Sequence, residues 1–238
     1  MTIAQQRTFL TAEWKNLLML NYAVDPALLQ SFVPAGTELD QCAGRTYVSL
    51  IGFEFNKTRI LGRAIPFHQA FEEVNLRFYV RRAEKRGVVF IRELVPKYAV
   101  TAVARFAYGE NYSCVPMSHR IERSAGSTLA EFSWGSGPNR CSISAQFSGE
   151  SDIPENGSLS QFITEHYWGY AAQRRGATVE YEVHHPQWKV MNATTARFTG
   201  NAEKYYGPEF ASVLDKQPDS AFLADGSAVT VFKGSLLR

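Results

Sequence analysis

Residues 92–97, with the sequence RELVPK, combine residue types that could carry out carbonyl chemistry. An apparent strand ends there and proline suits the first turn of a helix, so we expect Lys97 close to a helix N-terminus. The unpaired N–H groups of a helix N-terminus disfavour an ammonium ion, and apolar neighbours disfavour it further by desolvation. A neutral amine near a cation such as Arg92 is the nucleophile that Schiff-base enzymes need. The alternative is an ordinary solvated lysine, and the spacing alone favours that alternative.

Carboxylates that could move protons are Glu72, Glu73 and Glu93. In the segment from Glu73 to Arg77 the side chains of Glu73, Asn75 and Arg77 share one face of a predicted strand, because side chains alternate with period two. If that face lines a cavity, the three side chains form a row that orients a substrate. If it faces water, they are the polar side of an amphipathic strand. The periodicity leaves both interpretations open.

The adjacent His184 and His185 raise the question of a metal site. Neighbours on a strand point to opposite faces and cannot easily share one ion, so no metal is predicted. The preferred interpretation has one histidine inward and hydrogen-bonded and the other solvated. Pro186 and Trp188 then shape a turn and a pocket wall.

The composition is that of an ordinary globular protein, with 45% hydrophobic and 20% charged residues. The formal net charge is only +2 and the basic residues are scattered, whereas nucleic-acid binding needs a basic surface. We find no glycine-rich phosphate loop, dinucleotide fingerprint or nucleophile-elbow serine in the required context. A nucleic-acid protein, an NTPase, a Rossmann enzyme and an α/β-hydrolase are therefore poor hypotheses.

Cysteine usage and hydropathy predict the compartment. Cys42, Cys114 and Cys141 are odd in number and far apart, which fits neither disulfides nor a thiolate metal site, so we interpret them as small buried hydrophobic residues. No apolar run is long enough to cross a bilayer, and the first ten residues lack the features of a signal peptide. These features predict a cytoplasmic protein without a membrane partner.

Strands dominate the predicted elements, and they do not alternate strictly with helices. This disfavours a parallel doubly wound sheet and predicts one α+β domain over residues 1–238, mainly antiparallel β. A short helix should begin at Asp25 and Pro26, capped by the aspartate. Two longer helices are expected over residues 97–109 and 158–174. Strands are expected over residues 14–24, 38–42, 45–55, 74–82, 87–94, 113–123, 127–134 and 140–149, and again after residue 178.

Several of these segments together resemble the YqjF-like family of bacterial proteins of unknown function. The resemblance covers residues 14–190 and is specific through the order and spacing of its pieces. They are Trp14 with LLMLNY, ALLQSFVPAGTELD, Gly44 with Tyr47 and Val48, Glu73-x-Asn75-x-Arg77-x-Tyr79-Val80, SLSQFITEHYWGY and Glu182-Val-His-His-Pro-Gln-Trp188. That family looks like a relative of acetoacetate decarboxylase. The resemblance therefore implies a β-barrel or double sheet enclosing a cavity, with a few flanking helices.

A narrower resemblance to acetoacetate decarboxylase itself rests on ALLQSFVPAGTELD and RELVPK. It implies that Lys97 takes the place of the Schiff-base lysine and that Glu93 takes the place of an acidic residue nearby. The spacer before the proline is shorter here, and Tyr98 replaces the second lysine of the decarboxylase. No cofactor is implied.

Three hypotheses follow for the function. The first is a lyase, a decarboxylase or aldolase-like enzyme, that forms an imine between Lys97 and a small keto acid. The second is a non-catalytic pocket protein for a small ligand, and the third is a structural partner protein; homo-oligomers are compatible with all three. The predicted catalytic residues are Lys97, Glu93 and Glu73, and the predicted substrate-binding residues are Arg77, Asn75, Arg92, Trp14, Tyr22, Tyr79, His185 and Trp188.

Overall fold

The computed structural model describes residues 7–98, 100–101, 111–173 and 176–237. Most of the helix predicted over residues 97–109 lies outside these ranges. The described helices are α1 (Pro26–Leu29), α3 (Leu159–Thr164) and α4 (Glu203–Leu214). The strands are β1 (Thr8–Val24), β2 (Glu38–Leu39), β3 (Thr46–Ile60), β4 (Arg63–Ala64), β5 (Phe71–Arg82), β6 (Lys85–Val95), β7 (Tyr112–Cys114), β8 (Met117–Ser124), β9 (Ser127–Trp134), β10 (Cys141–Ser148), β11 (Trp168–Ala172), β12 (Thr178–His184), β13 (Val190–Gly200), β14 (Ser220–Phe232) and β15 (Ser235–Leu236).

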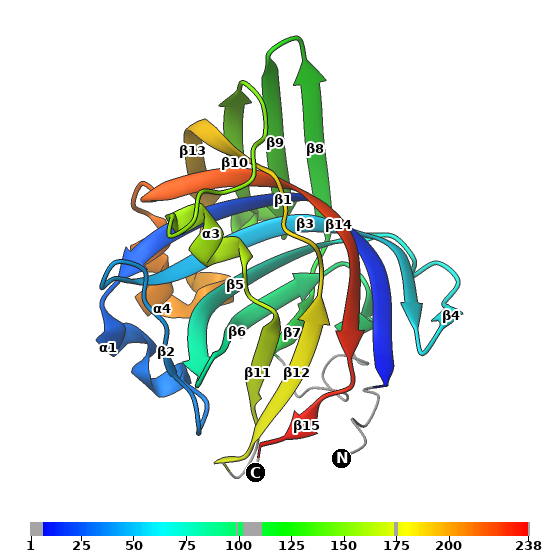
Figure 1. Cartoon of the computed structure of the whole chain (residues 1–238). Helices are drawn as coiled ribbons and strands as arrows, with labels where there is room; N and C mark the ends of the chain where they lie inside the picture. The colour runs from blue at the N-terminus through cyan, green and yellow to red at the C-terminus, as the bar shows by residue number, and fades with distance from the viewer. Residues whose placement is uncertain (1–6, 99, 102–110, 174–175, 238) are drawn as a thin grey trace.

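Seven of these strands pair into a ring in the order β12-β11-β6-β5-β3-β1-β14 (Figure 1). The ring closes where β12 pairs with β14, through Val183 opposite Val231 and His184 opposite Thr230. All neighbours in it are antiparallel except β11 and β6. The predicted antiparallel architecture is therefore confirmed.

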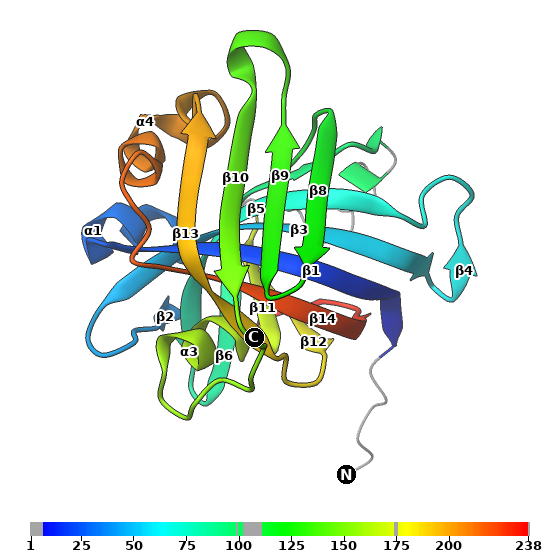
Figure 2. The same ribbon diagram turned by 90° about the horizontal axis from the view of Figure 1, so that it is seen from above.

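A second sheet of β13, β10, β9 and β8 leaves the ring through the pairing of β13 with β14. Its strands cross β1, β3 and β14 on the outside of the ring (Figure 2). One hydrophobic core fills the space between the two layers, with Leu50 and Phe78 from the ring and Phe132, Trp134 and Phe147 from the second sheet. The other core lies on the inner face of the ring.

Strand β5 shows how alternation assigns residues to these two cores. Val74, Leu76 and Phe78 are buried against the second sheet, and the residues between them point into the ring. The regular pairing of β5 with β3 keeps this alternation in register from residue 71 to residue 78. The sequence prediction that Glu73, Asn75 and Arg77 share a face is confirmed.

The segment 158–174, predicted to be one helix, divides into α3 and β11. Ser158 caps α3, as its hydroxyl accepts a hydrogen bond from the Gln161 N–H at 3.2 Å. The helix ends at Thr164, and β11 then pairs with β12 and β6. Gly169 permits this pairing because it has no side chain. A Cβ at this position would lie only 2.1 Å from the Tyr181 ring and would clash with it. Pairing with neighbouring strands overrides the helical pattern.

Two other elements test the sequence predictions. The helix expected at Asp25 and Pro26 is confirmed, with the Asp25 carboxylate accepting a hydrogen bond from the Ala27 N–H at 2.8 Å. Helix α4, within the segment predicted to be strands, was missed because Gly207 and Pro208 interrupt its pattern. None of the described helices combines the length and the hydropathy that crossing a bilayer requires.

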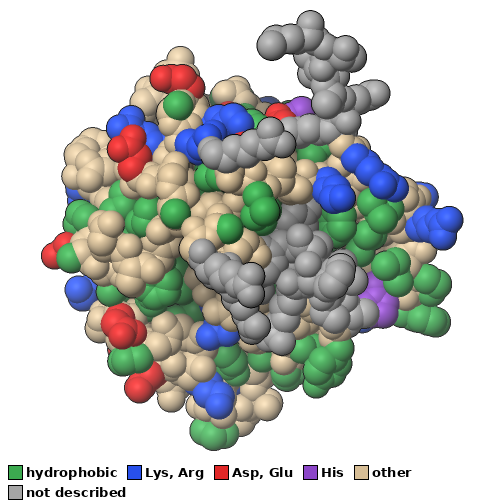
Figure 3. All heavy atoms as spheres, turned by 90° about the horizontal axis from the view of Figure 1, so that it is seen from below, with side chains coloured by type: hydrophobic (Ala, Val, Ile, Leu, Met, Phe, Trp, Pro, Cys, Tyr) green, Lys and Arg blue, Asp and Glu red, His purple; other side chains and the backbone are tan. Residues whose placement is uncertain are grey.

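The basic side chains are scattered on the face seen from the lower end of Figure 1, as the sequence analysis predicted. There, Lys and Arg side chains lie singly or in small groups among hydrophobic and acidic ones (Figure 3).

The three cysteines differ in burial. The interpretation of the cysteines as buried is correct for Cys141, whereas Cys42 and Cys114 are partly exposed. Cys42 forms an isolated β-bridge with Arg45, and Cys114 is the last residue of the short strand β7.

Candidate active site

A pocket with a cavity volume of about 130 Å³ lies on the inner face of the ring. Strands from all around the ring contribute to it, so ring closure forms the site. Its walls are mainly apolar and aromatic, which is typical of small-molecule sites. The apolar and aromatic lining residues are Phe9, Leu10, Trp14, Leu17, Ile51, Phe53, Phe55, Ile60, Phe71, Val88, Phe90, Val100, Tyr112, Trp168, Tyr181, Val183, Trp188 and Val231; the polar ones are Glu73, Asn75, Arg77, Glu93, Thr164, His166 and His185.

Glu73, Asn75 and Arg77 form a polar row along the floor of this pocket. An extended strand rises about 3.3 Å per residue, so the Cα atoms of Glu73 and Arg77 are roughly 13 Å apart with Asn75 midway. The row therefore has an acidic end, an amide centre and a cationic end. The interpretation of this face as a row lining a cavity is the one that the structure supports.

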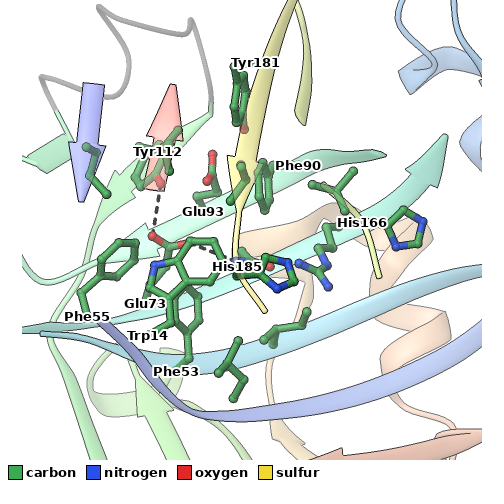
Figure 4. Close-up of a pocket in the computed structure, with 18 of the residues that line it drawn as sticks. Trp14, Phe53, Phe55, Glu73, Phe90, Glu93, Tyr112, His166, Tyr181 and His185 are labelled. Carbon is green, nitrogen blue, oxygen red and sulfur yellow. Dashed lines mark hydrogen bonds between the residues drawn. The ribbon is translucent and has the colours of Figure 1, made fainter. Parts of the chain in front are cut away.

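Two buried carboxylates lie side by side at the acidic end and the centre of the row (Figure 4). Glu73 is 3% exposed and Glu93 is 1% exposed. The Asn75 Nδ2 donates to Glu73 Oε1 at 3.0 Å, and the Tyr112 hydroxyl donates to Glu73 Oε2 at 3.1 Å. Glu93 lies directly opposite Asn75 in the pairing of β5 with β6. The pocket thus holds two acid–base groups from neighbouring strands.

Arg77 supplies the cationic end. Its Nη2 donates to the Ile163 carbonyl at 3.1 Å, and its guanidinium carbon lies 5.6 Å from the centre of the Tyr79 ring. Its Nε is buried and has no hydrogen-bond partner among the described residues. A buried donor without a partner is costly, so a carboxylate placed here would complete the site.

His166 is a polar group of the pocket that sequence reasoning missed. Its side chain is 1% exposed and its Nε2 lies 3.7 Å from Asp40 Oδ2. Its ring packs 4.6 Å from the Tyr79 ring. Burial lowers the pKa of His166 to about 4. Burial acts to raise the pKa of Asp40, but the nearby His166 ring and the hydrogen bond that Arg86 Nε donates at 2.7 Å outweigh it and lower that pKa to about 2.

The depressed pKa of His166 predicts a pH-dependent stability. The unfolded chain binds a proton at this residue below about pH 6.5, whereas the folded protein binds it only near pH 4. Between these values the unfolded state binds more protons, so stability rises with pH across the window, by about 3 kcal/mol. Urea unfolding measured from pH 4 to pH 7 checks this. The variant His166→Gln should flatten that slope; an unchanged slope would assign it to other groups.

His185 and Trp188 form a stacked pair in the pocket wall. Their ring centres are 4.1 Å apart with an interplanar angle of 18°. The Pro186 carbonyl can only accept, so the 2.9 Å contact assigns the hydrogen to His185 Nδ1. Burial lowers the pKa of His185. His184 is exposed and contacts Glu182, as the alternation of a strand predicts.

Four of the predicted site residues do not line this pocket. Tyr22 lies in the core between the two layers, and Tyr79 lies behind the lining, with its hydroxyl 2.5 Å from Ser49 Oγ. Arg92 points away from the pocket, because its Nε donates to the Tyr205 carbonyl at 3.1 Å. Lys97 is partly exposed. Every lysine of the chain lies in the described ranges, and none lines the pocket.

The remaining predicted residues are brought together in the pocket. They are Glu73, Glu93, Asn75, Arg77, Trp14, His185 and Trp188. Sequence reasoning missed several pocket residues, among them His166, Thr164 and Tyr112. Thr164 and His166 lie in the segment predicted to be one helix, and Tyr112 lies just before the strand predicted over residues 113–123. Alternation within a long strand was the only signal that could find the polar row.

The comparisons with known proteins agree with this fold. Residues 11–228 match the family DUF2071, described as an uncharacterized conserved protein. The chain belongs to this family. It is 28% identical over 189 residues to the uncharacterized protein YqjF of Bacillus subtilis (strain 168), a match that covers 76% of this chain and 74% of YqjF. The resemblance to YqjF-like proteins is confirmed.

Two solved structures show the same fold at low identity. The enduracididine biosynthesis enzyme MppR complexed with pyruvate is 14% identical, with a TM-score of 0.73 over 99% of this chain and 92% of MppR. Acetoacetate decarboxylase from Legionella pneumophila subsp. pneumophila str. Philadelphia 1 is 11% identical, with a TM-score of 0.67 over 97% and 87% of the two chains. The acetoacetate-decarboxylase-like fold is thereby confirmed.

Proposed function

We propose that the pocket binds a small oxo acid and that Glu93 moves a proton at the carbon beside its carbonyl. The observation that carries the proposal is the polar row with Glu93 beside it, because together they place one cation, one amide and two carboxylates in a mainly apolar pocket. Binding of pyruvate by MppR, a protein of the same fold, supports an oxo acid as the ligand class.

The ligand carboxylate binds at Arg77. The buried Nε of Arg77 offers a charge-assisted hydrogen bond, which the apolar walls strengthen by excluding water. A carboxylate held there directs the rest of the ligand along the row toward Asn75. The carbonyl and its neighbouring carbon then lie beside Glu93, which faces Asn75 across β5 and β6.

Proton transfer follows from that position. The Glu93 carboxylate takes a proton from the carbon beside the carbonyl, the C–H pair forms a C=C bond, and the carbonyl pair moves onto oxygen. The product is an enolate, which can be reprotonated or can attack a second carbonyl compound. Glu73, held by Asn75 and Tyr112, lies next to this base and completes the acidic end.

The role of Arg77 is tested by binding. Arg77→Gln removes the cation, and we expect the Kd for pyruvate to rise about 10- to 100-fold, since a hydrogen bond to a charged group contributes about 1.5–3 kcal/mol. Calorimetric titration measures this. The matched control is Lys189→Gln, which removes an exposed cation that does not line the pocket and should leave the Kd unchanged. Equal effects of the two variants would contradict carboxylate binding at Arg77.

An imine on Lys97 is the second candidate mechanism. The Thr101 N–H donates to the Lys97 carbonyl at 3.1 Å, which forms a helical turn, and Val100 in that turn lines the pocket. Lys97 therefore begins the turn that reaches the pocket wall. Borohydride added with pyruvate traps an imine as a mass adduct on the peptide that contains Lys97. Without an adduct, retained activity of Lys97→Arg supports proton transfer without an imine.

The experiment that tests the whole proposal is hydrogen exchange into the ligand. Pyruvate incubated with the protein in D₂O should lose its methyl proton signal faster than pyruvate alone, because each enolisation returns a deuteron. Binding without exchange would instead support a non-catalytic protein that binds a small ligand in the pocket. The absence of both binding and exchange across a panel of oxo acids would overturn the proposal.

A further inference from the structure

One end of the pocket is a cluster of four aromatic side chains that the proposed chemistry does not use. Trp14 contacts Phe53 and Phe55 edge to face, with ring centres 5.4 and 5.8 Å apart. Phe55 stacks on Phe71 at 4.7 Å with an interplanar angle of 13°. We call these four residues the aromatic box, and all four line the pocket.

The aromatic box begins at the acidic end of the polar row and extends beyond it. Phe53 is directly opposite Glu73 in the pairing of β3 with β5, and Phe55 is opposite Phe71, two residues further from Arg77. At about 3.3 Å per residue, the Cα atoms of Phe71 and Arg77 are roughly 20 Å apart. A three-carbon acid bound at Arg77 leaves the aromatic box without a ligand group.

An unpartnered polar atom in the aromatic box indicates what belongs there. The Trp14 Nε1 is buried and has no hydrogen-bond partner among the described residues. An indole N–H can only donate, so its partner must be an acceptor. Aromatic walls favour a planar apolar group, and the N–H favours one that carries an oxygen or a ring nitrogen.

We propose that the pocket is specific for aryl-substituted oxo acids whose ring carries a hydrogen-bond acceptor, with the ring in the aromatic box. This inference rests on the proposed oxo-acid function and names its substrate class. Arg77 binds the carboxylate, Glu93 lies beside the carbonyl region, and the aryl ring contacts Trp14 and Phe55. The acceptor on the ring takes the Trp14 N–H.

Calorimetric titration of the full chain with three acids tests the proposal. The probes are pyruvate, phenylpyruvate and 4-hydroxyphenylpyruvate, which add a ring and then an acceptor to one oxo-acid group. Phenylpyruvate should bind about tenfold or more tighter than pyruvate, as expected for burying an apolar ring. The hydroxyl should tighten binding several-fold again. Trp14→Phe, which keeps a ring but removes the N–H, should abolish the hydroxyl advantage and keep the phenyl advantage.

The outcomes separate this inference from the proposed function. Equal affinities for pyruvate and phenylpyruvate, with pyruvate binding still weakened in Arg77→Gln, would overturn aryl specificity and leave the oxo-acid function standing. A hydroxyl advantage that survives Trp14→Phe would overturn the role of the indole. If none of the three acids binds, the oxo-acid function and the inference fall together. Phe71→Leu, which shortens one wall, should weaken phenylpyruvate more than pyruvate.

Discussion

Replacing Glu93 by glutamine is expected to slow deuterium exchange into pyruvate by about 10²- to 10⁴-fold, the usual contribution of a positioned acid–base group. Glutamine keeps the shape of the side chain but cannot accept a proton from carbon. Because the side chain is 1% exposed and faces the pocket from β6, no solvent-exposed carboxylate replaces it easily. Proton NMR of the methyl signal over time gives the rate.

Two control variants separate catalysis from folding. Glu73→Gln should alter ligand binding more than folding; an equal loss of thermal stability and binding would point to a structural role. Glu72→Gln changes the neighbouring carboxylate, which contacts His119 and not the pocket, so exchange should continue at the original rate. Exchange that continues unchanged in Glu93→Gln would show that Glu93 is not the base.

Replacing Trp134 by alanine is expected to destabilise the fold by about 3–5 kcal/mol, the usual cost of deleting a large buried ring. Trp134 is 0% exposed, at the end of β9, with ring centres 6.1 Å from Phe198 and 6.4 Å from Tyr206. It therefore joins the second sheet to α4. Urea unfolding followed by circular dichroism measures the change.

Trp134→Phe is the matched control for that variant. The Trp134 Nε1 is buried without a partner among the described residues, so phenylalanine removes a costly polar atom together with part of the ring. The loss should be well below that of the alanine variant. Equal losses would mean that shape at this position matters more than buried volume.

The strands could be predicted from sequence because their patterns are long and local. In β5 the alternation spans twelve residues, and it correctly placed Glu73, Asn75 and Arg77 on one face. Whether that face meets water or a cavity depends on ring closure between β12 and β14, a contact between segments nearly fifty residues apart. No periodicity within one strand contains that information.

The candidate site was predicted less well than the strands. His166 lies in the stretch between α3 and β11, where a helical pattern yields to pairing with β12. Arg92 precedes the end of β6 by three residues, and a register shift between β5 and β6 falls next to it, so simple alternation misplaces its side chain. The direction of Lys97 depends on the path of the chain after β6, which the RELVPK pattern does not specify.

Strand β1 pairs with β3 along one edge and with β14 along the other. Its residues 8–21 pair with residues 220–232, so this pairing cannot begin until the chain has been synthesised as far as residue 220. During synthesis, β1 and β3 can pair soon after they emerge, but the other edge of β1 stays open until residues 220–232 have been made. Such an open edge can bind other chains, and closure of distant segments is slow. The ring, and with it the pocket, can therefore be completed only after β14 has emerged.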